Sequence, residues 1–208
     1  MNDLDHPIFT ESLRRIRGLL GPTGLEGYER DVMERLVHSG GDPSLALDLR
    51  FSAGACALGA SALSSGAPIL TDTAMAAAAV APMARRTFGN LVHSVLAWAP
   101  EVAPEGGTRA AEGIAHALAK HPGAVVLIGS APTALERLLD LTGDGGLPPP
   151  ALVIGMPVGF VGVAESKRRL ANSVLPQIRL EGSRGGAALA AAAANALLRG
   201  AWLARLQA

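Results

Sequence analysis

The chain has 208 residues, of which 49% are hydrophobic and only 3% aromatic, so its core must be built mainly from Ala, Leu and Val. This length suits one α/β domain and is short for two. Eighteen basic residues balance eighteen acidic ones, which excludes nucleic-acid binding through overall charge.

The first third of the chain predicts three helices. Apolar residues recur at helical spacing from Ile8 to Leu20, and Gly21-Pro22 ends that segment. A second helix is predicted from Tyr28 to the Gly40-Gly41 pair, and a third from Ala53 to Ser65.

From residue 66 onward, short apolar strands alternate with helices. The predicted strands are Pro68–Thr71, Leu91–Trp98, Ala124–Ile128, Ala151–Ile154 and Gln177–Leu180. The predicted helices are Thr73–Arg85, Thr108–Lys120, Thr133–Leu141, Ala164–Asn172 and Gly186–Leu206. Continuous apolar strands such as AVVLIG favour a parallel sheet that is covered on both faces. With right-handed crossovers, the sequence predicts a single doubly wound α/β domain over residues 1–208, preceded by N-terminal helices.

Cysteine content and the apolar runs exclude further classes of protein. Cys56 is the one cysteine, so no internal disulfide forms, and no Cys/His spacing predicts a bound metal. The opening residues lack the apolar region of a signal peptide. The longest apolar runs, such as Ala187–Leu198, are Ala-rich and too short to span a bilayer. We therefore expect a cytoplasmic protein with neither a membrane nor a nucleic-acid partner.

In a doubly wound sheet, ligands bind beyond the carboxyl ends of the strands. One such loop, Gly155–Gly162, has the spacing G-x-x-x-G-x-x-G, which is neither the dinucleotide fingerprint nor a P-loop. Its central glycine, Gly159, is a candidate for close approach of the backbone to a ligand. A tight turn explains the glycines equally well.

The run GMPVGFVGVAESK at Gly155–Lys167 closely resembles the signature of precorrin-8X methylmutases. The resemblance covers nearly the whole chain, with its motifs in the expected order. The other matching segments are His6–Arg17, Glu34–Asp42, Asp48–Ser52, Gly66–Met75, Thr108–Ala111, Ile128–Leu135 and Gly182–Leu197.

This resemblance implies a flavodoxin-like fold, a homodimer and one reaction of cobalamin biosynthesis. That reaction is an isomerisation that moves a methyl group from C-11 to C-12 of precorrin-8X and gives hydrogenobyrinate. In the cobalt-containing route, the same family rearranges cobalt-precorrin-8. No methyl donor is consumed, and the resemblance implies no cofactor. The sequence does not distinguish the metal-free substrate from the cobalt-containing one.

His38 is the candidate catalytic residue. Protonating, or hydrogen-bonding to, an atom of the macrocycle would bias its conjugated electrons toward the product. His38 matches the histidine of the family motif RxxH-x-x-GD. It lies in the last turn of the second predicted helix. The helix dipole at that end predicts a raised pKa for the imidazole. On position alone, an ordinary histidine at a helix C-terminus is the alternative.

The substrate of this family carries several carboxylate arms, which require cations and N–H donors. Arg109, which follows Thr108 at a helix start, is expected to face an anion there. Lys167 and Arg184 are candidates for the same reason, although Lys167 could equally pair with a nearby glutamate or point to water. Arg17 is a further candidate, and a solvated helix face explains it as well.

Three more residues after predicted strands are candidates for contacts with the substrate. Asp72 matches the family's TD-x-x-M motif and either orients a ring nitrogen or caps the helix that follows. Ser130 and Thr133 mark a strand-to-helix turn whose N–H groups suit a carboxylate, and Thr133 could serve only as a cap.

This chain departs from the family pattern at a few polar positions. Gly107 and Ser130 stand where the family commonly has Asn, and the GR-x-GGS loop loses an Arg at Ser183 and a Ser at Ala187. These losses leave open a non-catalytic tetrapyrrole-binding or carrier protein on the same fold. A nucleotide- or flavin-binding protein is a weaker alternative, because no phosphate-binding loop fits.

Overall fold

The structure is a computed structural model that describes residues 4–143 and 146–207. The apolar runs of the sequence form the central strands of one six-stranded sheet. The strands are β1 (Leu49–Phe51), β2 (Ile69–Thr71), β3 (Val92–Ser94), β4 (Val125–Ile128), β5 (Leu152–Gly155) and β6 (Gln177–Leu180). Every residue of β2, β4 and β5 is buried, as expected for strands covered on both faces.

Strand order confirms the predicted doubly wound, mainly parallel sheet. The order across the sheet is β1-β6-β5-β4-β2-β3, with β2 to β6 parallel and β1 antiparallel to β6. Taken alone, the five parallel strands have the 2-1-3-4-5 order of flavodoxin-like folds. The order reverses between β2 and β4, so the carboxyl ends of these two strands flank the switch point of the sheet.

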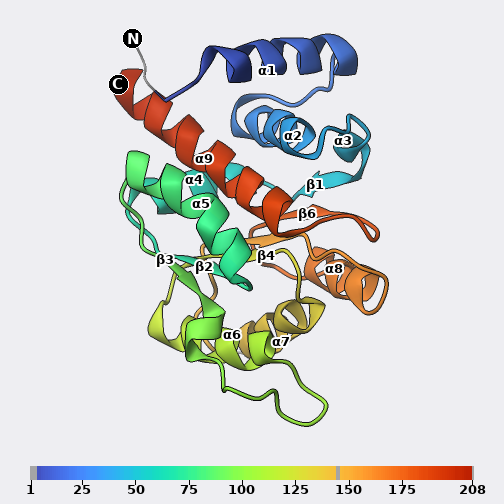
Figure 1. Ribbon diagram of the computed structural model, residues 1–208, viewed down its shortest axis with the longest axis vertical. Helices are drawn as coiled ribbons and strands as arrows, with labels where there is room; N and C mark the ends of the chain where they lie inside the picture. Colours follow the sequence, from blue (N-terminus) through green and yellow to red (C-terminus); the bar gives the residue numbers. More distant parts are fainter. Residues whose placement is uncertain (1–3, 144–145, 208) are drawn as a thin grey trace.

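Helices cover both faces of the sheet (Figure 1). One core cluster unites the sheet with α1 (Pro7–Leu20), α2 (Gly27–Gly40), α4 (Ala55–Ser64), α5 (Ala74–Arg86) and α9 (Ala187–Gln207). The cluster on the opposite face contains α6 (Arg109–Lys120), α7 (Pro132–Thr142) and α8 (Val163–Ala171). A short helix, α3 (Leu45–Asp48), leads from α2 into β1. The predicted N-terminal helices are therefore confirmed.

The alanine-rich helix α9 runs diagonally across its face of the sheet and packs on α2, α4 and α5 (Figure 1). Small side chains allow this close approach: a Cβ added at Gly59 of α4 would lie 3.1 Å from Leu197 of α9. Within the described residues, α9 is the one helix long and apolar enough to cross a membrane. Because 61% of its apolar window is buried, its composition reflects packing in the core.

Three elements differ from the sequence-based prediction, and one of them is the short helix α3, which was not predicted. The predicted strand Leu91–Trp98 is a strand only at Val92–Ser94, because Ser94 caps a 3₁₀ helix (Val95–Trp98) by accepting a hydrogen bond from Leu96 N. The sequence did not predict β1, whose three residues include the exposed Arg50 and show no clear strand pattern.

Candidate active site

The loops beyond the carboxyl ends of β4, β5 and β6 are hydrogen-bonded into one unit, here called the strand-end platform (residues 129–131, 156–159 and 182–186). Gly186 N donates to Met156 O at 2.8 Å, and Gly159 N donates to Ser183 O at 3.0 Å. A Cβ at Gly129 would lie 2.6 Å from Ala187 Cα, so only glycine fits there. The glycines thus allow the loops to approach one another, which favours the tight-turn interpretation.

Within this platform, the amide of Gly159 already has a partner in the chain. Gly159 has φ +139°, a conformation that side-chain-bearing residues rarely adopt. The tip of the same signature loop is apolar and exposed, with Phe160 95% and Val161 88% accessible to solvent. The platform therefore presents an apolar edge beside a polar, internally bonded base.

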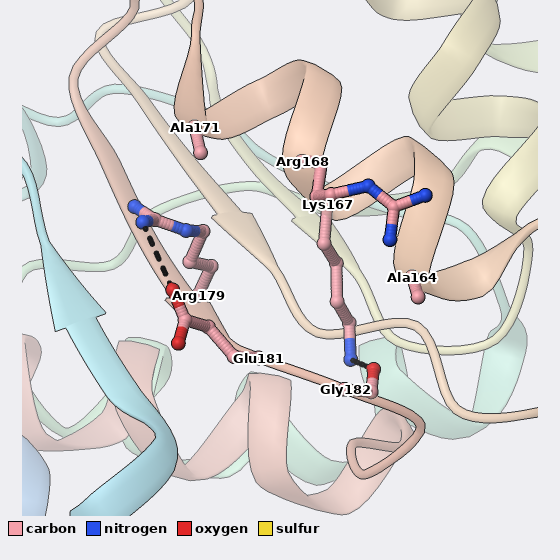
Figure 2. A pocket seen from close by; sticks show the side chains of 7 residues that line it. All are labelled: Ala164, Lys167, Arg168, Ala171, Arg179, Glu181 and Gly182. Atoms are coloured by element: carbon pink, nitrogen blue, oxygen red, sulfur yellow. Dashed lines mark hydrogen bonds and ion pairs between the residues drawn. The ribbon is translucent and has the colours of Figure 1, made fainter.

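Lys167 fastens the platform to α8. Its side chain lines a cavity of about 340 Å³, and Nζ donates to Gly182 O at 2.9 Å (Figure 2). Nζ also donates to Arg184 O at 2.6 Å. Lys167 is only 2% exposed. Burial lowers the pKa of its ammonium group to about 8, against the opposing attraction of Asp48. Arg168 and Arg179 line the same cavity.

Arg184 ties the platform to the segment that follows α2. Its guanidinium forms ion pairs with Asp42 and, at 3.0 Å, with Asp48 Oδ2, and donates to Ser44 Oγ at 3.1 Å. These acceptors use much of the hydrogen-bonding capacity of Arg184 within the chain. The structure therefore places this predicted substrate-binding residue in an internal ion-pair network.

Asp72 closes the switch point between β2 and β4. It is fully buried, and its Oδ2 accepts hydrogen bonds from Gly129 N (3.0 Å), Ser130 N (2.6 Å) and Ala131 N (2.8 Å). Burial raises the pKa of Asp72, while these three bonds oppose the shift. The N–H groups that we expected to receive a substrate carboxylate at Ser130 are thus bonded to a carboxylate of the chain itself.

The capping alternative for Asp72 named the wrong helix. Thr73, not Asp72, caps α5, by accepting a hydrogen bond from Ala76 N at 3.3 Å. Asp72 instead binds the amides that lead into α7, as its position at the switch point allows.

Arg109, Thr108 and Thr133 lie together at the starts of α6 and α7. Thr108 caps α6 by accepting from Ala111 N at 3.2 Å, and its hydroxyl lies 2.7 Å from that of Thr133. Arg109 is exposed, with its Nε donating to Pro100 O at 2.8 Å. These three residues leave polar atoms at the surface beyond the strand ends.

His38 lies in the last turn of α2, half-buried against α1. Its Nδ1 is 2.8 Å from Ser12 Oγ, and its ring meets the Phe9 ring edge-on, with centroids 5.1 Å apart. We call Ser12, Phe9, Arg35 and His38 the His38 cluster.

The C-terminus of α2 adjoins the start of α9, since a Cβ at Gly40 would lie 3.5 Å from Leu189. This contact, with Arg184 bound to Asp42, places the C-terminal end of α2 next to the strand-end platform.

The expected rise in the pKa of His38 is wrong. Burial lowers the pKa of the imidazole, and the positive charge of Arg35 lowers it further. Both effects act against the helix dipole.

Arg17 holds α1 on α2. Its guanidinium forms two hydrogen bonds with Glu34, from Nε to Oε1 at 2.6 Å and from Nη2 to Oε2 at 2.8 Å. Glu34 is fully buried, so this pair is a structural tie between the helices that carry Ser12 and His38.

Sequence reasoning missed Ser12 and Arg35. Ser12 lies within the matching segment His6–Arg17, and Arg35 is the arginine of the RxxH motif, one helical turn before His38. That helical spacing was the signal for Arg35, because residues three apart share a helix face. Among the described residues, no group of three or more His, Cys, Asp or Glu side chains could hold a metal ion.

The model of the precorrin-8X methylmutase family matches residues 7–200 of the chain. The chain belongs to this family. Members of the precorrin-8X methylmutase family are isomerases of cobalamin biosynthesis. The match spans both the His38 cluster and the strand-end platform.

Individual relatives of this methylmutase-family chain align over almost their full lengths. It is 43% identical to the precorrin-8X methylmutase of Pseudomonas aeruginosa, over 91% of this chain and 93% of that one. It is 37% identical to the cobalt-precorrin-8 methylmutase of Synechocystis, over 97% and 99%. A crystal structure of precorrin-8X methylmutase from Thermus thermophilus superposes with a TM-score of 0.85 at 41% identity, covering 94% of this chain and 98% of that one.

Proposed function

We propose that this chain moves a methyl group from C-11 to C-12 of precorrin-8X, giving hydrogenobyrinate, or performs the equivalent step on cobalt-precorrin-8. Support comes from relatives that carry each of these two substrate names and align with over nine-tenths of the chain. Because both names occur at similar identity, both substrates belong to the proposal. The migrating methyl and its acceptor carbon lie in one molecule, so the protein need only hold the macrocycle and shift its electrons.

The observation that carries the proposal is the half-buried imidazole of His38, fixed at one nitrogen only. When Ser12 donates its hydroxyl proton to Nδ1, the ring proton sits on Nε2. Nε2 has no hydrogen-bond partner among the described residues and can donate to the macrocycle. Because the pKa of His38 is lowered, the donor in the free protein at pH 7 is the neutral imidazole.

The predicted substrate-binding residues divide into two groups in this proposal. Arg109, Thr108 and Thr133 have polar atoms near the surface and bind carboxylate arms of the substrate. The remaining residues act by shaping the loops and helices around the ligand. They are Asp72, Ser130, Gly159, Lys167, Arg184 and Arg17.

The proposal includes a cytoplasmic, single-domain homodimer. The support for the dimer is that two apolar side chains beyond the carboxyl ends of β2 and β5 are exposed, Met75 at 67% and Phe160 at 95%. Exposed apolar side chains are stabilised when a second surface covers them. Light scattering on the purified protein should give twice the chain mass, and Phe160→Ser should shift it toward the monomer.

The test of the reaction uses the purified protein with precorrin-8X and, separately, with cobalt-precorrin-8, followed by visible absorption. His38→Ala should lower the turnover rate by about 10²- to 10⁴-fold, because it removes the proton or hydrogen-bond donor, while ligand binding persists. His116→Ala, an exposed histidine on α6, is the matched control and should leave turnover unchanged.

Turnover of His38→Ala at the wild-type rate would contradict the assigned role of His38. If the wild-type protein bound both compounds and converted neither, the carrier alternative would replace the reaction. The substrate that is converted identifies the metal state.

A further inference from the structure

The guanidinium of Arg35 lies one helical turn before His38 on α2. It sits over the face of the Phe9 ring, with Cζ 4.6 Å from the ring centroid. Its Nε is buried and has no hydrogen-bond partner. Over the described part of the chain, Arg35 has no hydrogen bond or ion pair at all. Arg35 is therefore a half-buried cation whose five N–H donors are free.

The carboxylates around Arg35 are already paired with other arginines. Arg199 of α9 also lies over the Phe9 ring, at 5.6 Å, but it binds both carboxylate oxygens of Asp5. On the other side, Glu34 is bound by Arg17. Arg35 thus stands beside two neutralised pairs and has no counter-ion of its own.

An unpaired, partly desolvated cation is costly for a folded protein. Burial, and then repulsion from Arg199, lower the pKa of Arg35, which expresses the same cost. A carboxylate from a ligand would relieve it, since the planar guanidinium matches a carboxylate with two parallel hydrogen bonds. The Phe9 ring that lies under Arg35 also contacts His38, so an anion bound there lies next to the imidazole.

We propose that Arg35 is a binding site for one carboxylate arm of the tetrapyrrole and that this contact positions the macrocycle at His38. This inference rests on the proposed function for the identity of the ligand. Arg35 is a substrate-binding residue in this account, and His38 remains the donor. Ser12 and Phe9, the other members of the His38 cluster, are uncharged.

Ligand binding at Arg35 has a consequence for His38. In the free protein, the charge of Arg35 disfavours the imidazolium. A bound carboxylate cancels that charge, so His38 binds a proton more readily in the complex than in the free protein. Arg199 and Asp5, which also face the cluster, are ion-paired with each other.

The test measures KM, kcat and product affinity for Arg35→Gln and Arg35→Lys. Arg35→Gln should raise KM and weaken binding of the product about 10- to 100-fold, as expected for loss of a charged hydrogen-bonding partner, with a smaller change in kcat. Arg35→Lys keeps the charge but not the two-pronged geometry and should give an intermediate value. Arg30→Gln, which removes an exposed charge from the same helix, is the matched control.

Two further measurements separate ligand binding from a structural role. Product forms amidated at single carboxylates should include one that the wild type and Arg35→Gln bind equally. NMR titration of His38 should show a higher pKa in the product complex than in the free wild type, with this rise lost in Arg35→Gln. Thermal unfolding verifies that each variant is folded, and Arg35→Lys decides the matter if Arg35→Gln is not.

The outcomes distinguish this proposal from the reaction itself. Wild-type KM and product affinity in both variants would overturn the role of Arg35 while leaving the reaction intact. If the wild type converted neither substrate but Arg35→Gln still bound the product more weakly, the reaction would fail and the carboxylate site would stand.

Discussion

The strand-end platform and the His38 cluster differ in how their cationic side chains are paired. Around the platform, Lys167 Nζ and Asp72 Oδ2 are bonded to backbone groups and Arg184 is held by carboxylates, whereas Asp72 Oδ1 is buried without a hydrogen-bond partner. In the His38 cluster, the guanidinium of Arg35 and Nε2 of His38 have no partner among the described residues. Because partners within the chain hold Lys167 and Arg184, we assign them a supporting role, and because Arg35 lacks a counter-ion, we assign the His38 cluster to the ligand.

The comparison also shows that the most distinctive motif and the residues with free hydrogen-bond donors lie in different parts of the chain. The motif around Gly155–Lys167 carries the most specific resemblance in the chain, and yet its lysine and glycines hold loops together. The less conspicuous helix around His38 presents the free donors. In this chain, the lysine of the distinctive motif therefore holds neighbouring loops in place.

The largest expected effect is on stability, at Lys167. Lys167→Ala removes a buried side chain and leaves the carbonyls of Gly182 and Arg184 without their donor, so the free energy of unfolding should fall by about 2–5 kcal/mol. Urea denaturation measures it, with the exposed Lys120→Ala as control. Unchanged stability with weakened substrate binding would move Lys167 from the supporting group to the ligand-binding group.

The pH dependence of stability sharpens the same test. Because burial lowers the pKa of Lys167 to about 8 from 10.5, the unfolded chain binds more protons than the folded one between these two values. The contribution of Lys167 to the free energy of unfolding should therefore rise with pH over that window, and this rise should vanish in Lys167→Ala. A difference between the two proteins that stays constant with pH would contradict the lowered pKa.

A smaller loss is expected at the switch point. Asp72→Asn leaves one side-chain oxygen to accept from the amides of Gly129, Ser130 and Ala131 but removes the negative charge, so the free energy of unfolding should fall by about 1–3 kcal/mol. Glu101→Gln, at an exposed carboxylate, is the control for charge alone. If Asp72→Asn were as stable as the wild type and only KM rose, Asp72 would belong to the ligand-binding surface.

The smallest expected effect is at Ser12. Ser12→Ala removes the hydroxyl at Nδ1 of His38 and frees the ring tautomer and orientation, so kcat should fall about 10-fold with stability nearly unchanged. Ser12→Thr keeps a hydroxyl and should recover part of the rate. The exposed Ser39→Ala is the control, and equal rates in Ser12→Ala and the wild type would argue against orientation of His38 by Ser12.

Much of the fold follows from the sequence because it depends on local patterns. Buried parallel strands such as β4 and β5 are continuous apolar runs, and periodic apolar residues mark α1 and α2. The strand β1 was not predicted, because its three residues include an exposed arginine and are too few to show the apolar alternation of a strand. The long loop after β3 obscured where the strand ended, since Ser94 turns the chain into a 3₁₀ helix.

The partners of the charged residues depended on contacts between distant segments. Arg184 meets Asp48 across 136 positions of sequence, and Asp72 meets Ser130 across 58. Helix spacing and dipoles give no information on such partners. For the same reason, the sequence predicted the wrong direction for the pKa of His38, because only the fold shows that α1 buries the ring.

The position of α9 has a consequence for how the protein is made. This helix fills the space between the sheet and three other helices, yet it follows all six strands in chain order. During synthesis, the apolar faces of β4 and β5 therefore leave the ribosome before the helix that shields them from water exists. Completion of the core must wait for this late segment, and until it docks the nascent chain exposes surface that chaperones recognise.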